Sequence, residues 1–255
     1  MDEETIQNEL PRGVALSWGI VKEPQRGPKR EMNVKQIVDA AIAIADAEGL
    51  AAVSMNKVAS SLGFTAMSLY RYIPSKEDLL LLMQDAVSEI GLDELIPEGM
   101  PWREGLRAYV KAMIHLFQSR PWFVEIPITG APITPNNLKV VDCALRIMRE
   151  LRLTDPEKMS VILLLSSYAR ACGILQRDFN SAVKAGMSSA AFSGAPYQSA
   201  LSKLVTAERF PDLHPLMISG AYTGTDEDAD EMFNDFDFGL ERILDGVEHY
   251  MAGKA

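Results

Sequence analysis

The sequence has 255 residues, of which 47% are hydrophobic, and it carries a formal net charge of −10 at pH 7. A chain of this length and apolarity can bury a sizeable core, which excludes a wholly disordered protein. The N-terminus is acidic where a secretory signal needs positive charge, and the longest apolar runs are shorter than the roughly 20 residues of a membrane span. We therefore expect a soluble, cytoplasmic protein with no membrane segment.

The charge is unevenly distributed along the chain, which matters for any polyanionic partner. Residues 10–76 contain nine Lys/Arg and five Asp/Glu, whereas residues 77–255 contain 16 Lys/Arg and 26 Asp/Glu. Screening in physiological salt hides charges beyond about 8–10 Å, so a basic segment can bind nucleic acid beside an acidic body. The overall acidity therefore does not exclude DNA binding.

Helical periodicity runs through almost every segment after residue 33, and strand patterns with hairpin turns are absent, which predicts an all-α fold. The first helix follows Asn33, a favourable N-cap, and stops at Gly49. Two short helices come next, the first from Ser54 to about residue 62 and the second over about residues 66–72. A longer helix then begins after Ser75 and continues to about residue 90.

Longer helices are predicted for the rest of the chain, with Pro-rich or Gly-rich joints between them. They cover about residues 102–119, 136–151, 156–179, 198–208 and 230–251, and the 198–208 helix has the weakest pattern. Thr154 and Glu157 form a capping box ahead of the third of these helices. Residues 181–199 and 211–230 are predicted to form loops.

The two short helices cannot be stable by propensity alone, and a helix-turn-helix accounts for their lengths. Their crossing needs a small residue, which is Ala59, and their turn needs a residue that tolerates positive φ, which is Gly63. The side chains expected to join the two helices from within are Val58, Leu62, Phe64 and Leu69. The outward positions of the second helix are then free to contact the major groove of DNA.

The segment IVDAAIAIADAEGLAAVSMNKVASSLGFTAMSLYRYIPSKEDLL resembles the DNA-binding domain of the TetR family of bacterial one-component repressors. The shared motifs are an A-x-x-L-G run that ends at Gly63, then S-L-Y-R-Y, then Lys76. The resemblance implies a three-helix helix-turn-helix domain at residues 33–80, after an N-terminal extension at 1–32. A larger helical domain for effector binding and dimerisation would occupy residues 81–255.

The resemblance also assigns the residues expected at DNA. Base edges would be approached by Thr65, Ala66, Met67 and Ser68, and phosphates would be held by Tyr70, Arg71, Tyr72 and Lys76. The predicted DNA-binding set is completed by Ser54 and by Lys29 and Arg30 of a basic arm. Such an arm lies along phosphates or enters the minor groove, and a solubilising tail is the alternative. Core packing is the alternative for the two tyrosines.

In this family the C-terminal helices form a ligand pocket and a dimer interface, and a palindromic operator requires a twofold dimer. The predicted interface combines the 156–179 helix with a stripe on the last helix, consisting of Phe233, Phe236, Leu240, Ile243, Leu244 and Val247. The predicted effector site is a cavity for a mostly apolar small molecule, formed by Tyr109, Met113, His115, Leu116, Phe117, Met148, Tyr168 and Cys172. Ordinary core packing is the alternative for each of these residues.

The sequence therefore predicts a ligand-responsive transcriptional repressor that a small effector releases from its operator. The alternatives are an adaptor of the same fold that binds protein partners and an all-α enzyme. The three histidines and two cysteines lack metal-ligand spacing, and no catalytic signature is present. No catalytic residue, metal site or cofactor is therefore predicted.

Overall fold

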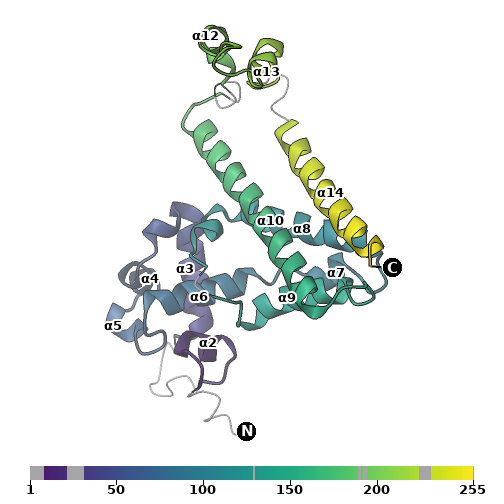
Figure 1. Cartoon of the computed structure of the whole chain (residues 1–255). Helices are drawn as coiled ribbons and strands as arrows, with labels where there is room; N and C mark the ends of the chain where they lie inside the picture. The colour runs from purple at the N-terminus through teal and green to yellow at the C-terminus, as the bar shows by residue number, and fades with distance from the viewer. Residues whose placement is uncertain are drawn as a thin grey trace. The chain divides into compact units, whose positions relative to one another are not determined.

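The computed structural model describes residues 9–21, 32–128, 130–188, 191, 194–223 and 231–254. Every regular element within these stretches is helical, which confirms the predicted all-α class (Figure 1). Contacts divide the chain into two compact units, residues 1–170 and 171–255, and each unit is described by itself.

The first unit opens with the helices that carry the predicted DNA-binding residues. They are α2 (Arg12–Ser17), α3 (Val34–Glu48), η1 (Leu50–Ala52), α4 (Met55–Ser61), α5 (Ala66–Leu69) and α6 (Lys76–Val87). Helix α2 was not predicted, because six residues are too few to show a period and its N-cap, Pro11, has no capping side chain. Helix α6 continues through residues 80 and 81, where the sequence suggested a domain boundary.

Side chains fix the starts of these helices as the sequence predicted. The Asn33 side chain accepts a hydrogen bond from the Gln36 N–H (2.7 Å), and the Gln36 side chain accepts one from the Asn33 N–H (3.1 Å). The Ser75 hydroxyl accepts a hydrogen bond from the Asp78 N–H (3.0 Å). Each cap satisfies an N–H group that the helix itself leaves without a partner.

A continuous apolar core joins α3, α4, α5 and α6, and α3 contacts both α4 and α6. Its fully buried members are Ile37, Ala41, Val58, Leu69, Ile73, Leu79 and Met83. Because α4 and α5 are too short to persist in isolation, this shared core is what holds them in place.

The remainder of the first unit forms a helical body. It contains α7 (Leu92–Leu95), α8 (Trp102–Ser119), η2 (Pro121–Glu125), α9 (Pro135–Ile147) and the first part of α10 (Asp155–Lys184). Helix α8 contacts α9 and η2, and α6 contacts α9. At the start of α10 the Thr154 N–H donates to the Glu157 carboxylate (2.7 Å), as expected for the predicted capping box.

The second unit contains the rest of α10 together with η3 (Ala195–Tyr197), α12 (Gln198–Leu204), α13 (His214–Ser219) and α14 (Glu231–Ala252). Helix α12 packs on α13, and Gln198 bonds to the Met217 carbonyl (3.4 Å) and the Thr223 hydroxyl (2.5 Å). The prediction of a loop over residues 211–230 was therefore wrong at α13. Contacts with α12, which no local pattern reveals, stabilise that short helix.

Helix α10 is longer and more apolar than the sequence suggested with respect to membrane spans. By length and composition it is apolar enough to cross a membrane, which the length of the uninterrupted apolar runs did not reveal. One such helix is weak evidence of a membrane span, because the core helix of a soluble protein passes the same test.

Candidate DNA-binding surface and effector region

The turn between α4 and α5 has the geometry of a Schellman motif. Gly63 has φ of 78°, the Phe64 N–H donates to the Ala59 carbonyl (2.9 Å), and the Gly63 N–H donates to the Ser60 carbonyl (3.1 Å). A Cβ at Gly63 would meet no other atom, so it is the backbone conformation that requires glycine. Ala59 is buried, as predicted for the helix crossing.

Helix α5 is a single turn with one inward and one outward side. Leu69 is fully buried, whereas Met67 is 72% exposed. Thr65 is also exposed, and Ala66 and Ser68 are partly exposed. The helix ends at Leu69 instead of continuing to residue 72, and the chain goes on in turns. The residues predicted to approach base edges are thus accessible on one short segment.

The residues predicted to hold phosphates follow directly after α5. Arg71 and Lys76 are exposed, Tyr72 is partly exposed, and Tyr70 is 46% exposed. This exposure disfavours the reading of Tyr70 as a core aromatic. Lys76 is the first residue of α6, where backbone N–H groups and the helix dipole also favour an anion.

Hydrogen bonds orient three of the hydroxyls in this region. The Thr65 and Ser68 hydroxyls lie 3.1 Å apart and share a hydrogen bond. The Ser54 hydroxyl caps α4 by accepting from the Lys57 N–H (3.2 Å). The Thr65–Ser68 pair keeps one donor available to a neighbouring acceptor, since each hydroxyl donates once. Lys29 and Arg30 lie outside the described residues.

Comparison with known families agrees with this geometry. Residues 37–83 match the family described as "Bacterial regulatory proteins, tetR family", and residues 97–251 match "Tetracyclin repressor-like, C-terminal domain". The chain belongs to the TetR family. This TetR-family chain is therefore a DNA-binding transcriptional regulator, which confirms the class of function that the resemblance implied.

Individual relatives extend over most of this TetR-family chain. The HTH-type transcriptional repressor DrrR1 of Streptomyces coeruleorubidus is 33% identical over 98% of this chain and 90% of its own length. Solved structures of ActR from Streptomyces coelicolor are similar as well. The complex with actinorhodin has a TM-score of 0.71 at 26% identity, covering 88% of this chain and 99% of ActR. The complex with (S)-DNPA has a TM-score of 0.68 at 25% identity, covering 87% and 100%.

The residues predicted to bind the effector differ in their exposure. Five are buried, namely Tyr109, Leu116, Phe117, Met148 and Cys172, whereas Met113 and Tyr168 are partly exposed. His115 is exposed on α8, so its side chain lies outside the apolar face with which it was grouped. Two surface pockets lie in the described part of the chain, one beside α3 and one between α9 and the start of α10, and neither is lined by any of these residues. An effector cavity at this position stays a prediction.

Among the buried residues of this group, Tyr109 carries a hydroxyl, which needs a hydrogen-bond partner. Its side chain hydrogen-bonds with Ser166 of α10, and burial raises its pKa above the ordinary tyrosine value. Cys143 of α9 lies nearby, and its pKa is also raised by burial, although the neighbouring Arg146 opposes the shift. Both groups are therefore neutral at physiological pH, and the Tyr109 hydroxyl is the polar group expected to orient an apolar ligand.

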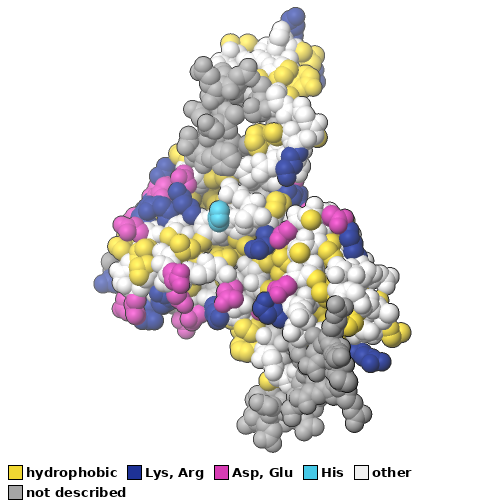
Figure 2. Space-filling view, turned by 180° about the vertical axis from the view of Figure 1, so that it is seen from behind, with side chains coloured by type: hydrophobic (Ala, Val, Ile, Leu, Met, Phe, Trp, Pro, Cys, Tyr) yellow, Lys and Arg dark blue, Asp and Glu magenta, His cyan; other side chains and the backbone are white. Residues whose placement is uncertain are grey.

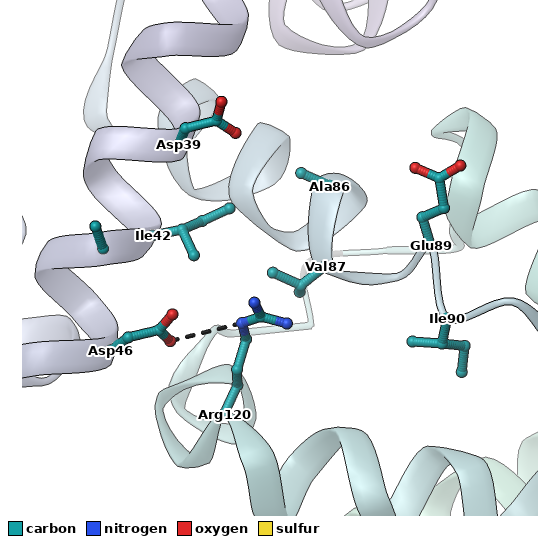
Figure 3. A pocket seen from close by; sticks show the side chains of 9 residues that line it. Asp39, Ile42, Asp46, Ala86, Val87, Glu89, Ile90 and Arg120 are labelled. Carbon is teal, nitrogen blue, oxygen red and sulfur yellow. Dashed lines mark ion pairs between the residues drawn. The ribbon is translucent and has the colours of Figure 1, made fainter.

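The pocket beside α3 lies between α3, the end of α6 and the residue that follows α8 (Figure 3). It measures about 390 Å³, and its charged lining residues are Asp39, Asp46, Glu89 and Arg120. Asp46 pairs with Arg120 (3.6 Å) and accepts a hydrogen bond from the Trp122 indole (2.6 Å). These contacts fasten α3 to the end of α8 and to η2. The charged lining does not resemble the mostly apolar cavity predicted for the effector.

The predicted dimer stripe on α14 stays a prediction. Leu240, Leu244 and Val247 are buried in the single chain. Phe236 and Ile243 are partly exposed, and the side chain of Phe233 lies outside the described residues. A periodic pattern shows that a helix has one apolar face, but it cannot show what covers that face.

Other apolar side chains of this TetR-family regulator are exposed instead. On α10 they are Met159, Leu163, Leu164 and Leu175, and on α14 they are Phe238 and Tyr250. Around α12 and α13 they include Tyr197, Leu204, Leu216, Ile218 and Tyr222, and Figure 2 shows hydrophobic side chains gathered over this part of the second unit. Exposed apolar patches of this kind mark candidate surfaces for assembly or ligand binding.

Proposed function

We propose that this chain is a cytoplasmic, homodimeric repressor that occupies a palindromic DNA operator and leaves it when a small, mostly apolar effector binds. The observation that carries the proposal is the segment from Thr65 to Lys76, in which Leu69 and Ile73 are fully buried and the other side chains are exposed or partly exposed. The alignment of 98% of this chain with a transcriptional repressor supports the proposal that this chain is also a repressor. The ligand complexes of ActR support a small-molecule effector.

The test of this proposal starts from DNA. Selection from a random duplex pool should recover a palindrome whose half-site centres lie about one helical turn apart, because a twofold dimer places two α5 helices in successive major grooves. Binding should weaken steeply with salt. Failure to enrich any duplex, together with capture of one defined protein partner, would favour the adaptor function.

The effector response should depend on Tyr109. Tyr109→Phe keeps the ring but removes the hydroxyl, so the variant should fold and bind the selected duplex normally. It should need an effector concentration about fivefold higher for release, since one neutral hydrogen bond is worth about 1 kcal/mol. The measurement is fluorescence anisotropy of the duplex during titration with actinorhodin, the ligand of ActR, or with a compound extracted from the purified protein.

His115→Ala is the matched control for this experiment, because His115 lies on the same helix but is exposed. It should leave the release curve unchanged. An equal shift in both variants would place the effector away from Tyr109, and an unchanged curve in Tyr109→Phe would make the hydroxyl a core group only.

Dimerisation should depend on the exposed apolar face of α10. Leu163 is 69% exposed in the single chain, so Leu163→Glu should fold normally but place a charge inside the proposed interface. Sedimentation at micromolar concentration should give a dimer for the natural chain and a monomer for the variant. Leu95→Glu makes the same change at an exposed leucine of α7 and should remain dimeric. A dimeric Leu163→Glu variant would remove α10 from the interface.

A further inference from the structure

Residues 9–21 of the N-terminal extension form part of the first unit. Helix α2 packs along α6, and Val14 and Ala15 are each 1% exposed. Gly13 lies at the closest approach, because a Cβ there would lie 2.3 Å from a carboxylate oxygen of Asp78. Any larger residue at position 13 must therefore displace Asp78 or lift α2 off α6.

The same segment also contacts the chain just ahead of α9. The Trp18 indole N–H donates to the Ile133 carbonyl (2.9 Å). Ile133 directly precedes Thr134, the N-cap residue of α9. The short stretch from Gly13 to Trp18 therefore touches both α6 and the entrance to α9.

A second contact joins α6 directly to the start of α9. Thr134 makes no side-chain cap bond to α9, and its hydroxyl instead accepts from the Asn137 side chain (2.9 Å). The cap is supplied by Asp85 of α6, whose carboxylate accepts from the N–H groups of Asn136 (2.8 Å) and Asn137 (3.3 Å). A carboxylate is well suited to this end of a helix, because the free N–H groups and the helix dipole both favour negative charge.

We infer that α2 and Asp85 form a joint that locks α6 to the start of α9, so that the N-terminal helix takes part in regulation. This inference rests on the proposed function. Helix α6 is a rod of about 18 Å that carries Lys76 at its first turn and Asp85 at its last. Helix α9 leads to the buried Met148 of the predicted effector region. With the joint intact, a displacement of α9 must be accompanied by α6, and therefore by the DNA-binding helices.

The joint can be tested without an effector, because coupling between two sites is reciprocal. Hydrogen–deuterium exchange of peptides covering residues 134–141 is measured in the full chain, with and without the selected duplex. In the natural protein DNA should slow exchange there by about fivefold or more. The slowing should be lost in Asp85→Asn, Trp18→Phe and Gly13→Val, while each variant still binds the duplex.

The design of the variants separates the outcomes. Asp85→Asn retains the size of the side chain but turns one acceptor oxygen into a donor. For each variant, the comparison is the ratio of its exchange rates with and without DNA. Trp18 is 48% exposed, so Trp18→Phe decides the matter if Asp85→Asn fails to fold. Glu94→Gln, an equal charge change at an exposed residue of α7, should keep the slowing.

Absence of slowing in the natural protein, or equal slowing in all three variants, would overturn the joint and leave α2 as packing only. Failure of the natural protein to bind any duplex would instead overturn the proposed function, so the two failures are distinguishable.

Discussion

Replacement of Leu69 by alanine is expected to abolish DNA binding, because Leu69 is the buried anchor of α5 in the segment from Thr65 to Lys76 that is proposed to contact DNA. Leu69 is the fully buried residue of the four-residue helix α5, which has no independent stability. The lost burial and the cavity left behind should lower the free energy of unfolding by about 2–5 kcal/mol. Urea denaturation followed by circular dichroism measures that loss, and anisotropy with the selected duplex measures binding.

The matched control is Met67→Ala in the same turn of helix. Met67 is 72% exposed, so its removal should change stability by no more than about 0.5 kcal/mol. It should change the preference for particular base pairs, because the exposed methionine side chain is proposed to meet thymine methyl groups. A large stability loss in Met67→Ala, or none in Leu69→Ala, would mean that α5 buries the side of Met67 and exposes that of Leu69.

Replacement of Lys76 by alanine is expected to weaken binding to every duplex by a similar factor. Lys76 is exposed at the start of α6, where it is proposed to contact a phosphate and not a base. Each phosphate contact contributes about one unit to the slope of log affinity against log salt, so the slope should flatten by about one per subunit. Titrations at several salt concentrations, on the selected duplex and on mutated duplexes, measure both effects.

Lys203→Ala is the control with the same change of charge. Lys203 is exposed on α12, away from the helix-turn-helix in sequence, and its removal should leave the slope unchanged. Loss of binding confined to one operator sequence would place Lys76 at a base edge. Unchanged binding would remove it from the interface.

The sequence by itself determined the elements whose signals are local. Asn33, Ser54 and Ser75 cap their helices, and Gly63 ends α4 in the left-handed conformation, because these roles depend only on a few neighbouring residues. Leu69 was also identified from the sequence as the inward residue of the second short helix, although that helix ends at Leu69 and not at about residue 72.

Packing against distant residues decided what local signals could not. Periodicity identified an apolar stripe on α14, but only the tertiary structure shows that Leu240 and Leu244 are buried in the single chain. Helix α13 depends on α12, and His115 faces solvent beside an apolar face of its own helix.

The joint between α2, α6 and α9 shows most directly what only the tertiary structure decided. Asp85 and Asn136 are 51 residues apart, and Trp18 and Ile133 are 115 apart. No sequence motif around Asp85 indicates that it caps another helix. From its position alone, Thr134 would be predicted to cap α9. The tertiary fold brings a carboxylate of one helix to the N–H groups of another, because a helix start accepts a cap from any chain segment that reaches it.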